Sequence, residues 1–316
     1  MRHLKKRHHL LSTGGKMKSL TGFLFGVLVS SICVASVAPT GRYKEIYNQM
    51  LALETQYPQL AKVFSIGTND DDVEMYAIRI STAPTSMDKS KIGQFLVATH
   101  HGNEGGSTQL AVEFAKDLLK RYQTEELWRG DLGQTEWTVL PVLNISGYNQ
   151  NARHEHGIDP NRDYPGPCSP KGWGKLKSIR TLIAFLESRP FAGSVTAHGY
   201  VGNFTYPWGF YTDNNKTLDE NRYHEMFRKI ADVNGYSFGN SGDSIYPANG
   251  CYEDFVYWKH GSWSLLVELL NGSSKDVAST VPAIAEFYNL IDSSPSAKNQ
   301  FSANCTRHRG PDLRHE

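Results

Sequence analysis

Cysteine is scarce in this chain of 316 residues, which contains only four. Cys33 lies in an N-terminal segment that we expect to be removed, which leaves Cys168, Cys251 and Cys305. Three cysteines allow at most one internal disulfide, so they exclude a small scaffold held together by several bridges. The fold must therefore depend on its core, and a hydrophobic content of 39% is sufficient for one.

An excess of charge of either sign is also lacking. The formal net charge is +1, but residues 1–38 carry six of the Lys and Arg residues and no Asp or Glu. Without that segment the chain has 27 basic and 32 acidic side chains, a net charge of about −5. A mildly acidic chain without a basic stripe argues against nucleic acid as a partner.

No apolar run is long enough to predict a membrane span with confidence. Residues 17–38 carry a lysine near their start, an apolar run over 20–34 and small residues at their end. This layout predicts a secretory signal peptide, so we expect a secreted or periplasmic protein without stable membrane insertion. A buried strand or an uncleaved anchor is the alternative. Residues 1–16 would be an upstream segment or an extension of the positive region.

No repeat or low-complexity linker divides the remaining chain, so we predict one domain over 39–292 and a loose polar tail over 293–316. Helical periodicity occurs in five segments: 41–56, 108–122, 175–188, 216–233 and 280–291. Strand-like runs occupy six segments: 63–67, 73–81, 94–99, 137–144, 194–198 and 265–270. Their alternation predicts an α/β fold, with a central mixed, mostly parallel twisted sheet and helices on both faces.

Three polar residues lie where predicted strands end. His101 and Glu104 follow the strand 94–99, and His198 ends the strand 194–198. Functional side chains gather at the carboxyl ends of strands in open α/β sheets. Two imidazoles and one carboxylate suit zinc, and three protein ligands leave one position open, as in catalytic sites. Taken singly each signal is weak, because a His and a Glu three residues apart are common and strand-end histidines often have structural roles.

The segment Asp159-Pro160-Asn161-Arg162 is a second signal. Its Asn and Arg side chains could pair with a free carboxylate, because a guanidinium binds a carboxylate through a two-pronged fork. An Asp-Pro turn followed by a surface ion pair is the alternative, and the more common one for such a segment seen alone.

Together these residues resemble the zinc carboxypeptidase family that includes carboxypeptidases A and B. The resemblance covers roughly residues 41–292 and rests on the order of these positions: His101, Glu104, Asn144, Arg153, Asp159, Asn161, Arg162, His198, Tyr246 and Glu268. Tyr246 lies 22 residues before Glu268, the same spacing as in carboxypeptidase A. The span from Glu104 to His198 is shorter than in the pancreatic enzymes, so we expect different loops around the site.

The resemblance implies one zinc ion per chain, held by His101, Glu104 and His198. Asp159 would hydrogen-bond the outer nitrogen of His101 and orient the ring. Glu268 would take a proton from water and pass it to the leaving amine.

The resemblance also implies how a substrate is held. Arg153 would stabilise the negative oxygen of the tetrahedral intermediate, and Asn161, Arg162 and Tyr246 would bind the terminal carboxylate. Glu253 occupies the family position at the base of the side-chain pocket, which is acidic in carboxypeptidase B. A carboxylate there would pair with a cation, so we expect preference for C-terminal Lys or Arg, or for the amino group of diaminopimelate.

We therefore predict a zinc-dependent metallocarboxypeptidase, a monomer that acts on peptides with a free C-terminal carboxylate. A murein peptide carboxypeptidase or amidase of the same family is one alternative. A non-catalytic carboxylate-binding module and a deacylase are others, although the full set of residues argues against both. Neighbouring Asp254 and Lys259 also leave open that Glu253 turns outward or is neutralised internally.

The cysteines allow one further prediction. Cys168 lies shortly after Arg162 and Cys251 shortly after Tyr246, so both loops should border the same pocket. Because an exported protein meets oxidising conditions, we predict a disulfide between Cys168 and Cys251. Free thiols are the alternative.

Overall fold

The computed structural model describes residues 36–124, 133–169, 172–291 and 301–306. Most of the predicted signal peptide lies outside the described residues, and its cleavage stays a prediction. In the described part of the chain, no helix is both long and apolar enough to cross a membrane.

Among the described residues eight strands form one sheet, in the order β1-β2-β4-β3-β5-β8-β6-β7. Their bounds are Ala61–Thr68 (β1), Glu74–Ile80 (β2), Ile92–Ala98 (β3), Thr135–Leu140 (β4), Gly193–Gly199 (β5), Asn203–Tyr206 (β6), Ser237–Asn240 (β7) and Trp263–Leu269 (β8). Strands β4, β3, β5 and β8 run parallel to their neighbours in this central group, whereas the β1–β2, β2–β4 and β6–β8 pairs are antiparallel. The predicted α/β fold with a mixed, mostly parallel sheet is confirmed.

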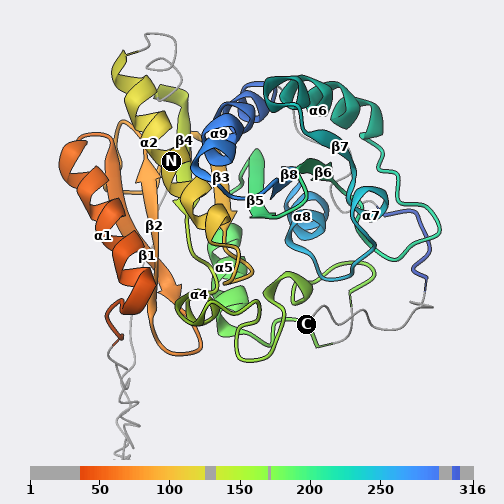
Figure 1. The fold of residues 1–316 in the computed structure, drawn as a ribbon, viewed down its shortest axis with the longest axis horizontal. Helices are drawn as coiled ribbons and strands as arrows, with labels where there is room; N and C mark the ends of the chain where they lie inside the picture. Colours follow the sequence, from red (N-terminus) through yellow and green to blue (C-terminus); the bar gives the residue numbers. More distant parts are fainter. Residues whose placement is uncertain (1–35, 125–132, 170–171, 292–300, 307–316) are drawn as a thin grey trace, which may run out of the picture. The chain divides into compact units, whose positions relative to one another are not determined.

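Helices pack on both faces of the sheet (Figure 1). The helices are α1 (Gly41–Gln56), α2 (Gly105–Thr124), α4 (Ile145–Gln150), α5 (Lys177–Glu187), α6 (Glu220–Asn234), α7 (Ser241–Ser244), α8 (Tyr252–Phe255) and α9 (Ser274–Asn289), with shorter turns η1 (Pro160–Arg162) and η2 (Val256–His260). Trp137 of β4 meets Phe114 of α2 and Tyr288 of α9 on one face. Phe95 of β3 pairs in register with the residue after Trp137, so it points to the other face, where it meets Phe185 of α5.

Some element boundaries differ from the predictions for local reasons. Helix α9 begins six residues earlier than predicted, because the Ser273 side chain caps it by accepting from the Asp276 backbone N–H. Strand β4 ends at Leu140 rather than continuing to Asn144, and the Asn144 side chain caps α4 by accepting from Gly147 N–H at 2.7 Å. Strands β6 and β7 have four residues each, too few to produce a recognisable periodic pattern.

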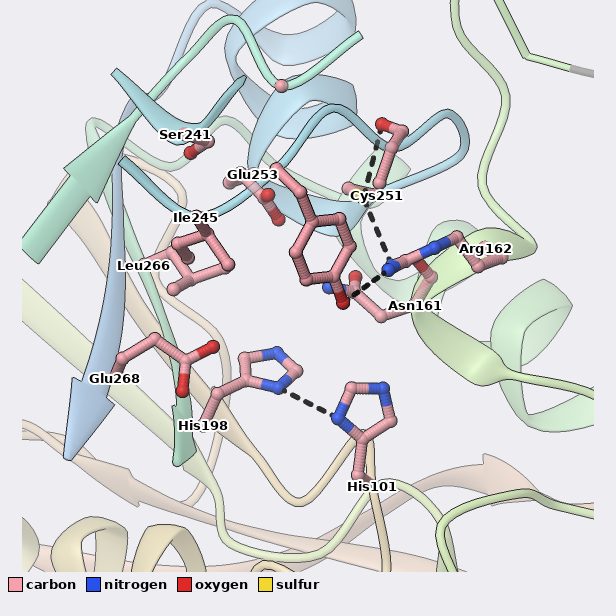
Figure 2. Close-up of a pocket in the computed structure, with 13 residues that line it drawn as sticks. His101, Asn161, Arg162, His198, Ser241, Ile245, Cys251, Glu253, Leu266 and Glu268 are labelled. Atoms are coloured by element: carbon pink, nitrogen blue, oxygen red, sulfur yellow. Dashed lines mark hydrogen bonds between the residues drawn. The ribbon is translucent and has the colours of Figure 1, made fainter. Parts of the chain in front are cut away.

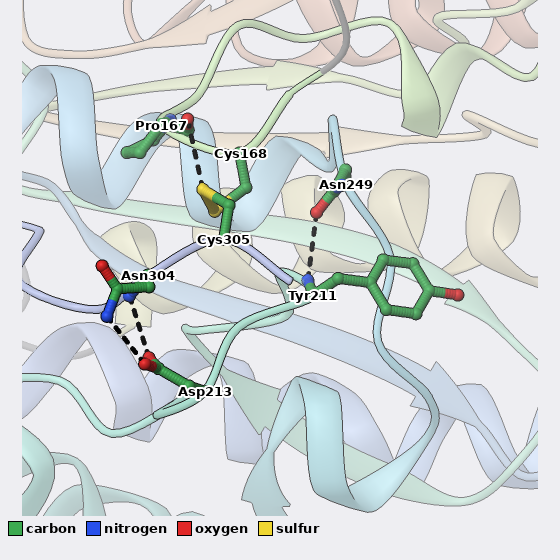
Figure 3. The surroundings of a disulfide bond; sticks show 7 residues. All are labelled: Pro167, Cys168, Tyr211, Asp213, Asn249, Asn304 and Cys305. Carbon is green, nitrogen blue, oxygen red and sulfur yellow. Dashed lines mark hydrogen bonds between the residues drawn. A yellow bond between two sulfur atoms is a disulfide. The ribbon is translucent and has the colours of Figure 1, made fainter. Parts of the chain in front are cut away.

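The predicted disulfide is wrong: Cys168 pairs with Cys305, and Cys251 is a buried free thiol (Figure 3). The two bonded residues have Cα atoms 5.4 Å apart, within the range that a disulfide requires. Cys251 is unavailable because its sulfur faces Arg162 and the Ala248 carbonyl instead. The disulfide therefore involves the segment 301–306, which lies within the predicted loose tail.

The segment 301–306 is docked by more than its disulfide. Asn304 donates from its backbone and its side chain to the two carboxylate oxygens of Asp213, both at 2.8 Å (Figure 3). Phe301 packs edge-on against Trp208 and Phe210, with ring centroids 5.3 and 5.6 Å apart. This C-terminal strap, residues 301–306, thereby ties the loop after Arg162 to the loop after β6.

We expect Cys305→Ala to destabilise the protein measurably. The bond joins residues 137 positions apart in the sequence, and its loss raises the conformational entropy of the unfolded chain. Bridges of this kind typically contribute about 2–4 kcal/mol to the free energy of unfolding. Urea denaturation under oxidising conditions should show this loss, and a reductant should remove the difference from wild type. Equal stability of variant and wild type without reductant would contradict the pairing.

Candidate active site

The site forms where three parallel strands end. Strand β3 stops at Ala98, and Thr99 turns the chain with a positive φ of 61°, its hydroxyl donating to the Pro141 carbonyl at 2.8 Å. His198 lies near the end of β5 and pairs in register with Glu268 of β8. Since residues opposite each other on adjacent strands point to the same face, the His198 and Glu268 side chains emerge together.

His101, Glu104 and His198 form a buried cluster whose ligand atoms all lie within 4.8 Å of one another. The Glu104 carboxylate lies 2.8 Å from His101 Nδ1 and 3.1 Å from His198 Nδ1. The two Nδ1 atoms are themselves 3.2 Å apart and face each other (Figure 2). Two imidazole nitrogens and a carboxylate that converge on one point fit a shared cation, and this donor set is that of catalytic zinc.

The outer nitrogen of His101 is held by a carboxylate. Asp159 Oδ1 lies 3.1 Å from His101 Nε2, and Asp159 Oδ2 accepts from Arg153 Nε and Nη2 at 3.2 and 2.9 Å. Burial alone would raise the pKa of Asp159, but His101, Arg162 and Arg153 hold it well below the ordinary value. An ionised Asp159 keeps the proton of His101 on Nε2 and leaves Nδ1 free to bind a cation.

The carboxylate of Glu104 within the cluster and that of Glu268 beside it have opposite pKa shifts. Burial raises the pKa of Glu268 to about 8, and the charge of Glu104 adds to this shift. Burial opposes ionisation of Glu104 as well, but His101 and His198 hold its pKa at about 2. Among the described residues Glu268 Oε2 has no hydrogen-bond partner. Glu104 is thus suited to bind a cation, and Glu268 to exchange a proton near neutral pH.

A cavity opens beside the cluster (Figure 2). It is lined by thirteen residues: His101, Asn161, Arg162, His198, Gly209, Ser241, Ile245, Tyr246, Ala248, Cys251, Glu253, Leu266 and Glu268. Tyr246 is 46% exposed and Glu253 only 2%, so the cavity runs inward from Tyr246 to Glu253. Arg162 lines it near Tyr246, whose hydroxyl accepts from Arg162 Nη2 at 3.1 Å.

The inner end of the cavity is lined by the carboxyl group of Glu253, and the buried Asp254 follows it in the chain. Burial raises the pKa of Glu253, although Arg162 and the Asn161 amide oppose the shift. Burial and the charge of Glu253 raise the pKa of Asp254 further, and its side chain accepts from the Gly209 backbone N–H at 2.9 and 3.0 Å. A Cβ at Gly209 would lie 3.3 Å from Asp254 and 3.7 Å from Glu253, so the glycine leaves space beside both carboxyl groups.

The structure brings the predicted site residues together. Two of them, Arg153 and Asn161, also make contacts within the protein that their predicted substrate-binding roles did not include. The Arg153 guanidinium binds Asp159 and comes no nearer than 3.7 Å to the Glu104 carboxylate. Asn161 uses its Oδ1 to accept from the Tyr252 backbone N–H at 2.8 Å, so it also anchors the start of α8.

His100 precedes the candidate ligand His101 in the sequence and has a structural role in the core. His100 is fully buried, with Nε2 2.8 Å from the Tyr164 hydroxyl and Nδ1 3.2 Å from the Thr196 hydroxyl. Its ring stacks on His198 with centroids 5.3 Å apart, which supports the orientation of that ring. Burial, together with His198 and His101, lowers its pKa well below the ordinary value, so it stays neutral. Its place next to His101 in the sequence was the only available signal.

Comparison with known proteins shows which family this chain resembles. Residues 46–287 match the sequence model of the zinc carboxypeptidase family. Human carboxypeptidase B is 25% identical over 276 residues, covering 74% of this chain and 65% of its own length. Carboxypeptidase SOL1 of Arabidopsis thaliana is 22% identical over 227 residues, covering 67% of this chain and 46% of its own. The chain therefore spans less than two thirds of the length of either relative.

A solved structure shares the fold. The crystal structure of thrombin activatable fibrinolysis inhibitor superposes with a TM-score of 0.69 at 17% identity, covering 78% of this chain and 73% of the other. Because the family match covers most of the chain, the chain belongs to the zinc carboxypeptidase family, whose members are metallopeptidases.

We expect the purified protein to bind about one zinc ion per chain, because the described residues contain one such set of two His and one Glu. Asp159→Asn should weaken zinc binding about 10- to 100-fold, the usual loss when the outer partner of a ligating histidine is removed. Competition with a zinc-sensitive dye would measure this. Glu268→Gln is the matched control and should bind zinc as the wild type does. If the His198→Ala variant bound zinc as tightly as the wild type, the proposed set of zinc ligands would be wrong.

Proposed function

We propose that this chain is an exported zinc carboxypeptidase that releases single residues from peptides with a free C-terminus. The observation that carries the proposal is the adjacency of a zinc-type cluster, a glutamate whose buried Oε2 has no hydrogen-bond partner among the described residues, and a cavity lined by arginine: His101, Glu104, His198, Glu268 and Arg162. The Cys168–Cys305 disulfide supports export, because such bonds persist in oxidising compartments.

His101, Glu104 and His198 would hold the zinc ion. When bound, zinc polarises a carbonyl and lowers the pKa of water. Glu268 has a pKa raised to about 8, and its Oε2 has no hydrogen-bond partner in the described part of the chain, so it accepts the proton of the attacking water and donates it to the leaving amine. Arg153, next to Glu104, stabilises the negative charge that develops on the carbonyl oxygen.

Recognition of the terminal carboxylate falls to the residues around Arg162. Its guanidinium lines the cavity together with Tyr246 and Asn161 and presents fixed N–H donors there. A carboxylate entering this cavity loses water and gains a charge-assisted hydrogen bond in return. A peptide without a free carboxylate would bury the charge of Arg162 without supplying an anion to it, so the site selects chain ends.

Glu253 is proposed to select the side chain that enters the cavity. It is buried, one of its oxygens has no hydrogen-bond partner among the described residues, and Gly209 leaves space beside it. A lysine, an arginine or the amino group of diaminopimelate would supply the missing charge partner. The last of these would make the protein a murein peptide carboxypeptidase, which the same cavity would accommodate.

The test of exopeptidase activity compares one peptide with a free and an amidated C-terminus. The wild type should cleave only the free form. Arg162→Ala should raise KM for it about 10- to 100-fold, because a hydrogen bond to a charged group is lost. Glu268→Gln should keep zinc and lose about 10²- to 10⁴-fold in kcat, the usual contribution of a general base. Equal cleavage of free and amidated peptides would refute the role of Arg162.

The test of side-chain selection compares hippuryl-Arg with hippuryl-Phe, and a tripeptide ending in diaminopimelate provides a third substrate. We expect the wild type to prefer a cationic residue and Glu253→Ile to shift the preference to Phe, because the buried charge is gone. Glu253→Gln is the matched control, since it keeps the shape and removes only the charge. If the wild type prefers hippuryl-Phe, or if Glu253→Ile leaves the ratio of hippuryl-Arg to hippuryl-Phe cleavage unchanged, Glu253 does not select the side chain.

A further inference from the structure

Cys251 lies where the segment before α8 packs against the segment that contains Arg162, and both segments line the cavity. It precedes α8 and follows Gly250, whose backbone has a φ of +81°. A Cβ at Gly250 would come within 2.4 Å of the Arg162 carbonyl oxygen, so only glycine allows the two chains to approach this closely. The approach places the buried Cys251 sulfur 3.3 Å from Arg162 Nη1 (Figure 2).

The direction of each hydrogen bond at this sulfur follows from its partners. A guanidinium has only donors, so the Cys251 sulfur accepts from Arg162 Nη1. A carbonyl oxygen only accepts, so the S–H donates to the Ala248 carbonyl at 3.4 Å. Burial raises the pKa of the Cys251 thiol well above its ordinary value despite the nearby Arg162, so the proton stays in place. The neutral thiol is thus oriented as well as buried.

The remaining contacts of Arg162 show what this orientation achieves. Nη1 carries two hydrogens, and its two acceptors are the Asn161 carbonyl at 2.6 Å and the Cys251 sulfur. Nη2 donates one hydrogen to the Tyr246 hydroxyl, and its other hydrogen has no acceptor among the residues that the structure describes. One edge of the guanidinium is therefore fixed to the protein, while the Nη2 edge remains available on the cavity side.

We propose that Cys251 is a positioning residue, whose thiol fixes the rotation of the Arg162 guanidinium so that Nη2 meets the carboxylate of the substrate. The inference rests on the proposed function, since it assigns Arg162 a carboxylate to bind. It makes the buried free cysteine part of substrate recognition through Arg162, without contact to the reacting atoms.

A double-mutant cycle tests this directly. Binding of hippuryl-Arg is measured by calorimetry in the zinc-loaded Glu268→Gln protein, where cleavage does not interfere. Cys251→Ala should weaken binding about tenfold, within the range of one hydrogen bond to a charged group. The same change in an Arg162→Ala background should have less than about a twofold effect, because there is no guanidinium left to orient. With Glu268 intact, Cys251→Ala should raise KM and leave kcat unchanged.

Two further variants separate orientation from packing. Cys251→Ser keeps a donor and an acceptor on a shorter arm, so its affinity should lie between those of wild type and Cys251→Ala. Ser194→Ala is the matched control, because the Ser194 hydroxyl bonds the Tyr252 hydroxyl at 2.6 Å beneath α8 and makes no contact with Arg162. Its stability should fall while its affinity for hippuryl-Arg stays that of the parent.

The outcomes distinguish this inference from the proposed function. An equal loss of affinity in both Arg162 backgrounds, or no loss at all, overturns the positioning role whether or not the enzyme is active. A Cys251-dependent affinity in a wild type that cleaves no peptide would refute the proposed activity and leave the positioning role intact. No binding of hippuryl-Arg to the zinc-loaded protein would overturn both.

Discussion

The site is organised around the convergence of His101, Glu104 and His198, three buried side chains at the edge of the cavity. Three groups with lone pairs meet at hydrogen-bond distance, and two of their ring nitrogens face each other. Burying these lone pairs next to one another costs folding free energy unless the three groups share a bound cation. Burial also raises the pKa of Glu268 to about 8, next to a Glu104 that remains ionised. The same enclosure thus produces both a metal site and a proton acceptor.

The parallel core of the sheet explains how distant residues meet there. Strands β3, β5 and β8 end at one edge and deliver His101, His198 and Glu268 from positions far apart in the sequence. The cavity beside them is built from loops, and these loops are tied to each other. Asn161 bonds the start of α8, and the Gly250 backbone packs against Arg162. The C-terminal strap then fixes the loop that contains Cys168. Rigid loops of this kind hold a specific ligand geometry better than free ones.

The sequence allowed the fold and the cluster to be predicted, because both depend on periodicity and on the order of ligand residues after strands. The resemblance to the zinc carboxypeptidases placed Glu253 at the base of the side-chain pocket, and Glu253 lines the cavity and is buried. The disulfide could not be predicted, since the orientation of Cys251 toward Arg162 and the return of residues 301–306 are properties of the folded chain. The structural role of His100 and the capping of α8 by Asn161 likewise depend on contacts that no spacing reveals.

The central claim is that this site hydrolyses the last peptide bond of a chain. The most direct measurement follows a peptide ending in lysine during incubation with the zinc-loaded protein in ¹⁸O-water, by mass spectrometry. The expected products are shortened stepwise from the C-terminus, and each carries ¹⁸O in its newly formed carboxylate. Internal fragments, shortening from the N-terminus, or an unchanged peptide would contradict it.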